Sequence, residues 1–175
     1  MSVAIEAWIK ALHHTQPEAQ FVSLEPEDGT HALLAAVWPL ASTGRYQAVS
    51  YANHAFGKAE LAIDVAASNA EDAAEWALAM LEFIDDHRAT TDLVPGAMFM
   101  ASKPHVDFAP ADAWVIGLAK QIELAEASGP HLSLYPIFQG EIEVLRQVGL
   151  SAFLKKLGSE VTNPHRAPET INPRP

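Results

Sequence analysis

The amino-acid sequence predicts an α+β domain, with helices packed against a mixed and largely antiparallel β-sheet. Two observations lead to this fold class. The first is the order of the expected elements: a helix, three strands, a second helix, and then further strands and helices. The second is the apolar periodicity, which follows a helical spacing in some segments and a strand spacing in others.

The chain is expected to begin with a helix over residues 2–14. Its apolar residues recur at helical intervals, namely at Ile5, Trp8, Ile9 and Leu12. Pro17 stops this pattern, and residues 25–30, with the sequence EPEDGT, predict a turn.

Three short apolar segments separated by turn residues follow, and each is expected to form a strand. They span residues 31–40, 45–52 and 58–67. In the third segment, Leu61, Ile63 and Val65 alternate with Ala62, Asp64 and Ala66. One face of this strand is therefore apolar and the other is small or polar, which favours a sheet covered on one side.

A sharply two-faced helix is expected over residues 68–88, with Ser68 or Asn69 as its N-cap. At 100° per residue its carboxylates fall in an arc of about 100°, opposite a face of apolar side chains. We call this set the acidic row, and it consists of Glu71, Glu75, Glu82, Asp85 and Asp86. The acidic row is the predicted partner-binding surface, because it suits a basic protein.

The rest of the chain predicts strands over residues 94–101, 113–118 and 131–138, with a loop at 102–112. A helix from about residue 140 and another at 151–157 follow. The last stretch, TNPHRAPETINPRP, has four prolines and is expected to be an extended arm. The predicted organisation is therefore an N-terminal helix and turn (1–30), a main domain (31–160) and a Pro-rich arm (161–175).

Composition and charge exclude several classes of protein. A chain of 175 residues with 49% hydrophobic residues fits one globular domain. It contains no cysteine, which excludes disulfides, thiolate zinc sites and cysteine nucleophiles and suits a reducing cytoplasm. No uncharged run reaches the roughly 20 residues of a membrane helix. The net charge of −11 disfavours nucleic-acid binding, so we expect a cytoplasmic protein that binds neither membrane nor nucleic acid.

No nucleotide-binding, cofactor-binding or hydrolase signature occurs in the sequence, so no cofactor and no catalytic residue is predicted. The best metal candidate is the pair His105 and Asp107, with His131 or His54 as conceivable partners, but this spacing is typical of ordinary loop histidines. His87 lies near a helix end, where a hydrogen-bonded structural histidine is expected.

Glu141 lies on an apparently apolar helix face, which raises the question of its role. General acid–base chemistry with Asp107 or Asp64 is one hypothesis, although nothing in the sequence brings these carboxylates together. The simpler interpretation is that Glu141 stabilises the exposed backbone amides in the first turn of the helix that follows FQG.

Several short motifs, in this order, resemble the suppressor-of-fused-like family in its bacterial single-domain form. The first is YQAVSYANHAFGKAELAIDV, in which the matching residues are Tyr46, Ser50, Gly57, Glu60 and Leu61. Trp76, Pro95-Gly96 and Asp107-Phe108 come next. The junction LYPIFQGEIEVL matches at Pro136, Ile137, Glu141 and Glu143, and the end resembles the family in NPHRAP or INPRP. The resemblance covers roughly residues 33 to 168.

This resemblance implies a suppressor-of-fused-like α/β sandwich and a non-enzymatic, protein-binding function. In the family, animal members restrain a transcription factor, whereas bacterial members occur beside toxin systems as immunity proteins. For this chain it implies a protein partner, either a toxin to be neutralised or a regulator to be sequestered. Two alternatives stay open: a small metal- or carboxylate-dependent hydrolase using the His105 and Asp107 loop, and a regulator that binds an extended peptide at a sheet edge.

Overall fold

The structure is a computed structural model of residues 1–175. It describes residues 3–27, 29, 32–40, 44–51, 53, 59–87, 89, 93–101, 112–120 and 131–158. The predicted loop at 102–112 and the predicted Pro-rich arm fall almost entirely outside these residues.

The described residues form a seven-stranded sheet in the order β1-β2-β3-β4-β7-β6-β5. Neighbouring strands are antiparallel except β4 and β7, which are parallel. This arrangement confirms the predicted α+β class with a mixed, largely antiparallel sheet. The strands are β1 (Gln20–Leu24), β2 (Leu33–Leu40), β3 (Arg45–Tyr51), β4 (Glu60–Ala66), β5 (Met98–Met100), β6 (Ala113–Lys120) and β7 (His131–Ile137).

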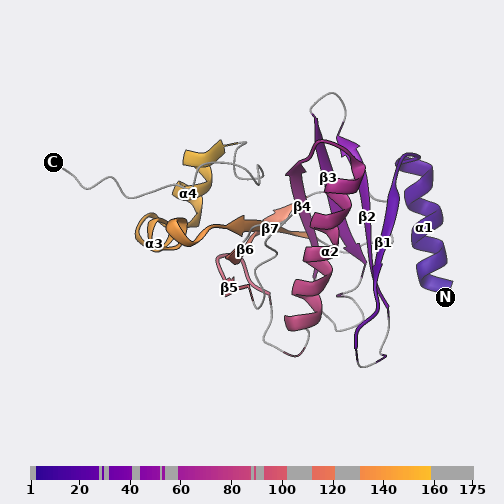
Figure 1. Ribbon diagram of the computed structural model, residues 1–175, viewed down its shortest axis with the longest axis horizontal. Helices are drawn as coiled ribbons and strands as arrows, with labels where there is room; N and C mark the ends of the chain where they lie inside the picture. The colour runs from indigo at the N-terminus through magenta and orange to yellow at the C-terminus, as the bar shows by residue number, and fades with distance from the viewer. Residues whose placement is uncertain are drawn as a thin grey trace.

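Helices cover both faces of the sheet (Figure 1). The helix α2 packs on one face against Leu61, Ile63 and other apolar residues of β2, β4, β6 and β7. The opposite face carries α1 at one end of the sheet and the pair α3–α4 at the other end. The helices are α1 (Val3–Thr15), α2 (Ala70–His87), α3 (Gln139–Val148) and α4 (Leu150–Leu157).

The expectation of a sheet covered on one side is wrong. Ala62, on the small face of β4, is fully buried and belongs to a cluster with Trp8 of α1 and Val49 of β3. Ala36 lies in the same cluster on β2. Small side chains on a strand face allow a helix to approach the sheet closely, so here they mark a covered face rather than a solvated one.

One strand was not expected from the sequence. β1 begins three residues after Pro17, and it pairs antiparallel with β2 from Gln20↔Val37 to Leu24↔Leu33. The other predicted strands and helices within the described residues are confirmed, with boundaries shifted by a few residues. A bulge in β6 between Ile116 and Ala119 places Gly117 under the ring of Tyr135.

Candidate functional site

The acidic row lies on the side of α2 that faces away from the sheet. Glu71 and Asp86 are exposed, whereas Glu75, Glu82 and Asp85 are half-buried. On the other side of the helix, Trp76 and Met80 are fully buried against the sheet. The predicted two-faced character of this helix is therefore confirmed. Its 18 residues include no lysine or arginine.

The first turn of α2 shows why the helix begins where it does. Asn69 Oδ1 accepts a hydrogen bond of 2.9 Å from the backbone N–H of Asp72. Asp72 Oδ2 in turn accepts one of 3.2 Å from the N–H of Ser68. The first bond satisfies an amide that the helix itself leaves without a partner and makes Asn69 the N-cap, and the second holds the residue before the cap against the same turn. Asp72 therefore serves the start of the helix, although it is exposed like Glu71 and Asp86.

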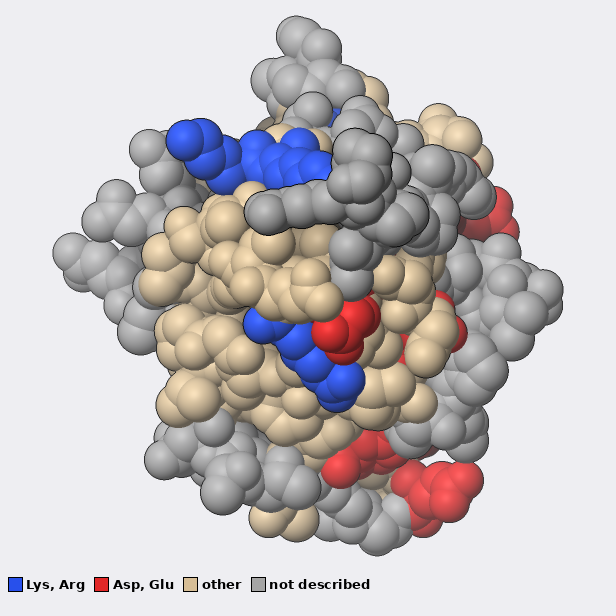
Figure 2. Space-filling view, turned by 90° about the vertical axis from the view of Figure 1, so that its left-hand side faces the viewer, with Lys and Arg blue, Asp and Glu red and all other residues tan. Residues whose placement is uncertain are grey.

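Charge is distributed unevenly over the surface. Figure 2 views the α3–α4 end of the molecule, where lysine and arginine side chains lie at the top and centre of the face. Apart from a carboxylate beside the central basic group, the acidic side chains gather toward the lower and right-hand margins. Arg146 of α3 and Lys155 and Lys156 of α4 are exposed. The acidic row thus belongs to a region separate from these cations.

A second carboxylate centre is buried where β3 ends and β4 begins. Glu60 is 3% exposed, and its Oε2 accepts hydrogen bonds from the hydroxyl of Ser50 and from the N–H of Asn53, the latter at 3.2 Å. The hydroxyl of Ser50 also accepts a bond of 2.9 Å from the N–H of Leu61. Asn53 Nδ2 donates to the carbonyl of Ala59 at 3.0 Å. We call this the Glu60 network, and it joins the ends of two neighbouring strands.

Two further titratable side chains lie near Glu60. Tyr51 stacks on Trp8 with ring centroids 4.6 Å apart, and burial, followed by the negative charge of Glu60, raises the pKa of its phenol. His131 stands opposite Glu60 in the parallel pairing of β4 and β7 and is 2% exposed. Because these groups are buried within the sheet and Glu60 Oε2 already accepts two protein donors, the arrangement stabilises the fold rather than presenting a nucleophile to a substrate.

Glu141 is fully buried at the start of α3. One of its carboxylate oxygens, Oε2, accepts a hydrogen bond of 3.0 Å from the backbone N–H of Phe138, three residues earlier. The interpretation of Glu141 as a helix-start residue is therefore confirmed. The neighbouring Asp112 binds the N–H of Gln139 at 2.8 Å, which ties the start of β6 to the same helix end.

The histidine hypotheses have different outcomes. Nδ1 of His87 lies 2.9 Å from the carbonyl oxygen of Phe83, and its ring stacks on Phe83, as expected of a structural histidine. His54, His105 and Asp107 lie outside the described residues, so the metal and hydrolase alternatives stay hypotheses. Among the residues that the structure does describe, no three metal-binding side chains form a group. Within the same part of the chain, no helix has the length and apolarity needed to cross a membrane.

Comparison with known proteins identifies the fold. No family model and no curated protein matches the sequence. One solved structure, described as a suppressor of fused protein homolog from Neisseria gonorrhoeae FA 1090, matches with a TM-score of 0.67 and 13% sequence identity. The match covers 95% of this chain and 97% of the other chain. The chain has a suppressor-of-fused-like fold.

The suppressor-of-fused-like fold explains part of the sequence resemblance in physical terms. Of the five residues matched in the first motif, Ser50, Glu60 and Leu61 meet in the Glu60 network. Sequence analysis did not assign them a shared role, nor did it foresee that Asn53 and His131 lie beside them. The sequence feature that could have indicated the Glu60 network is a serine near the end of one predicted strand followed by a glutamate near the start of the next.

Proposed function

We propose that this protein is a non-enzymatic protein-binding module and that the acidic row of α2 contacts a basic surface on its partner. The observation that supports this function best is the composition of α2. The helix carries five carboxylates on the side away from the sheet, of which Glu71 and Asp86 are exposed and the other three half-buried; it carries no lysine or arginine and buries its other side in the core. A rigid, single-sign surface of this kind attracts a basic partner and orients it during encounter.

The buried carboxylates support the same conclusion by contrast. Glu60 and Glu141 accept hydrogen bonds from the protein and are almost or completely inaccessible to solvent. They are therefore not available for proton transfer to a substrate without local opening of the fold. The exposed carboxylates Glu71 and Asp86 of α2, by contrast, are within reach of a partner.

Two roles fit such a module within the suppressor-of-fused-like fold. As an immunity protein it would cover a basic toxin, whereas as a regulator it would sequester a basic protein from its target. Both roles require only tight, salt-sensitive association. The identity of the partner distinguishes them, since a toxin loses its activity in the complex and a regulator loses its access to another macromolecule.

The experiment is a pull-down from host lysate at low salt with three forms of the protein. The test form carries Glu71→Lys and Asp86→Lys, because both carboxylates are exposed. The matched control carries Glu6→Lys and Glu143→Lys, which are exposed on α1 and α3 and change the net charge equally. We expect a specific basic protein that the wild type and the control retain and the test form loses. Equal retention by all three forms would refute the acidic row as the contact surface.

A further inference from the structure

The sheet has two edges within the described residues, and they differ in length. β5 forms one edge with three residues, whereas β1 forms the other with five. Figure 1 shows β1 at the end of the sheet nearest α1. In the described part of the chain, β1 pairs with β2 and with no second strand. An edge strand presents backbone N–H and C=O groups that can pair with another extended chain.

β1 lacks the features that usually protect an edge strand. Its sequence, QFVSL, contains no lysine and no proline, and its pairing with β2 is continuous in register, without a bulge. Pro17 and Pro26 lie outside the strand on either side. Natural sheets prevent edge pairing with charges, prolines, bulges or very short strands, and of these devices only shortness applies, to β5.

The side chains of β1 prolong both apolar layers as far as this edge. Phe21 packs against the cluster that α1 covers, and its ring lies 5.9 Å from that of Trp8. Val22 and Leu24 pack on the opposite face, against the cluster that α2 covers. A strand added beside β1 would therefore continue a sheet that is already sandwiched, with apolar neighbours for alternate side chains on each face.

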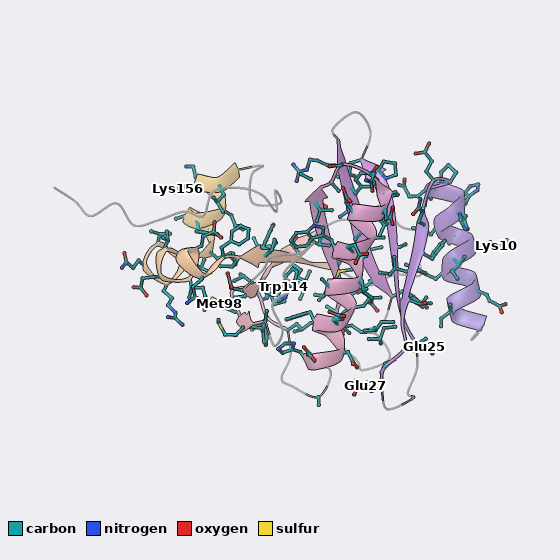
Figure 3. The ribbon with its side chains drawn as sticks, in the orientation of Figure 1. Lys10, Glu25, Glu27, Met98, Trp114 and Lys156 are labelled. Carbon is teal, nitrogen blue, oxygen red and sulfur yellow. The ribbon has the colours of Figure 1, made fainter. Side chains whose placement is uncertain are left out.

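Carboxylates stand at both ends of β1. Glu18 precedes the strand, and Glu25 and Glu27 follow it, and all three are exposed. Figure 3 labels Glu25 and Glu27 after the end of the strand. The helix with the acidic row packs over the same strand. The edge is thus flanked by carboxylates, and no lysine or arginine occurs between positions 11 and 44, although the ring of His13 on α1 lies 5.0 Å from that of Phe21.

We propose that β1 is a docking edge, at which an extended, lysine- or arginine-rich segment of the partner adds as a further strand. This inference rests on the proposed function and specifies how the partner binds. Backbone hydrogen bonds to β1 would supply affinity, and the flanking carboxylates would select a basic segment.

A second copy of this chain is expected to bind the β1 edge more weakly than a basic segment, because the carboxylates of the two copies repel each other. Antiparallel pairing of β1 with β1 of another copy would bring the Glu18 end of one strand beside the Glu25 end of the other. Like charges placed in this way destabilise strand pairing, and two chains of net charge −11 also repel at longer range. A basic segment from a partner would experience neither of these repulsions.

The test uses the full-length protein and the synthetic peptide KVTVKVTVK, with capped ends, as a defined probe. Two control peptides accompany it: one with glutamate in place of each lysine, and one with N-methyl groups at alternate residues, which removes donors without changing charge. Affinity is measured at low and at physiological salt, and amide hydrogen exchange locates the contact. We expect the lysine peptide to slow exchange of β1 amides, and neither control peptide to do so.

Variants separate this inference from the proposed function. The change Glu18→Lys with Glu25→Lys should weaken peptide binding about tenfold or more at low salt, and Glu6→Lys with Glu143→Lys should change it far less. Protection elsewhere than β1, equal binding of the N-methylated peptide, or no binding at millimolar peptide would overturn strand addition. If β1 amides are protected only as protein concentration rises, the occupant is a second copy. The lysate experiment with the α2 variants judges the proposed function independently of these outcomes.

Discussion

The carboxylates of this protein belong to two regions with opposite physical roles. Glu60 and Glu141 lie in the interior, where backbone or side-chain donors bind them. Glu71 and Asp86 lie on the outer side of α2 and face water. Carboxylates therefore hold the ends of strands and helices in place in the interior, whereas on the surface of α2 they produce a negative electrostatic potential. Removal of a carboxylate should lower stability in the first region and partner affinity in the second.

The largest effect on stability is expected for Glu60→Ala. The substitution leaves the hydroxyl of Ser50 and the N–H of Asn53 buried without their acceptor, in a region where water cannot replace it. We expect the free energy of unfolding to fall by about 3–5 kcal/mol. Urea denaturation followed by tryptophan fluorescence measures this quantity.

A double-mutant cycle with Ser50→Ala tests whether the network accounts for that loss. Ser50→Ala should cost much less in the Glu60→Ala background than in the wild type, because the shared hydrogen bond is already gone. Additive losses would show that the two residues act separately. In that case the Glu60 network would not be evidence that interior carboxylates stabilise the fold.

Glu141→Ala is expected to have the next largest effect. It removes the acceptor for the N–H of Phe138 at the buried start of α3. A cap of this kind contributes about 1–2 kcal/mol to the free energy of unfolding. Glu141→Gln keeps a carbonyl acceptor and should lose less. A fall in partner affinity with unchanged unfolding would instead place Glu141 among the binding residues.

The pH dependence of stability offers a smaller and more specific test of the interior region. Burial, and then Glu60, raise the pKa of Tyr51 above its usual value of 10.0. Above pH 10 the unfolded state therefore releases the phenolic proton before the folded state does. The unfolded state then binds fewer protons, so stability falls as the pH rises through the folded-state pKa. Tyr51→Phe should lack this part of the decline, as measured by urea denaturation between pH 9 and about pH 11.

Sequence periodicity predicted most elements because each follows from local physics. The apolar and acidic sides of α2, and the alternation in β4, can be read from a single segment. β1 was missed because five residues between a proline and a turn give too short a pattern. The covered second face of the sheet was missed because alanine at positions 36 and 62 resembles a solvated face in pattern, although it permits close helix packing.

The candidate sites also differ in whether a single segment of the sequence predicts them. The acidic row needs only helical geometry, so the sequence predicted on which side of α2 these carboxylates lie, and their role in partner binding stays a prediction. The Glu60 network depends on the register between β3 and β4 and on the contact of Ser50 with a residue ten positions away. Cross-strand register is a tertiary property, and no single segment encodes it. The sequence resemblance marked Ser50 and Glu60 as matching residues but gave no reason for their pairing.

The smallest effect on stability is expected for Glu71→Lys combined with Asp86→Lys. Both side chains are exposed, and exposed charges contribute little to the free energy of unfolding because water and salt screen them. The melting temperature should therefore stay close to that of the wild type, while the salt-dependent part of partner affinity is lost. Calorimetry and binding titrations at two salt concentrations on the same preparations provide both values. A large fall in melting temperature would show that α2 needs these carboxylates to fold. A loss of binding could then result from unfolding, and it would not support a role of these carboxylates in partner contact.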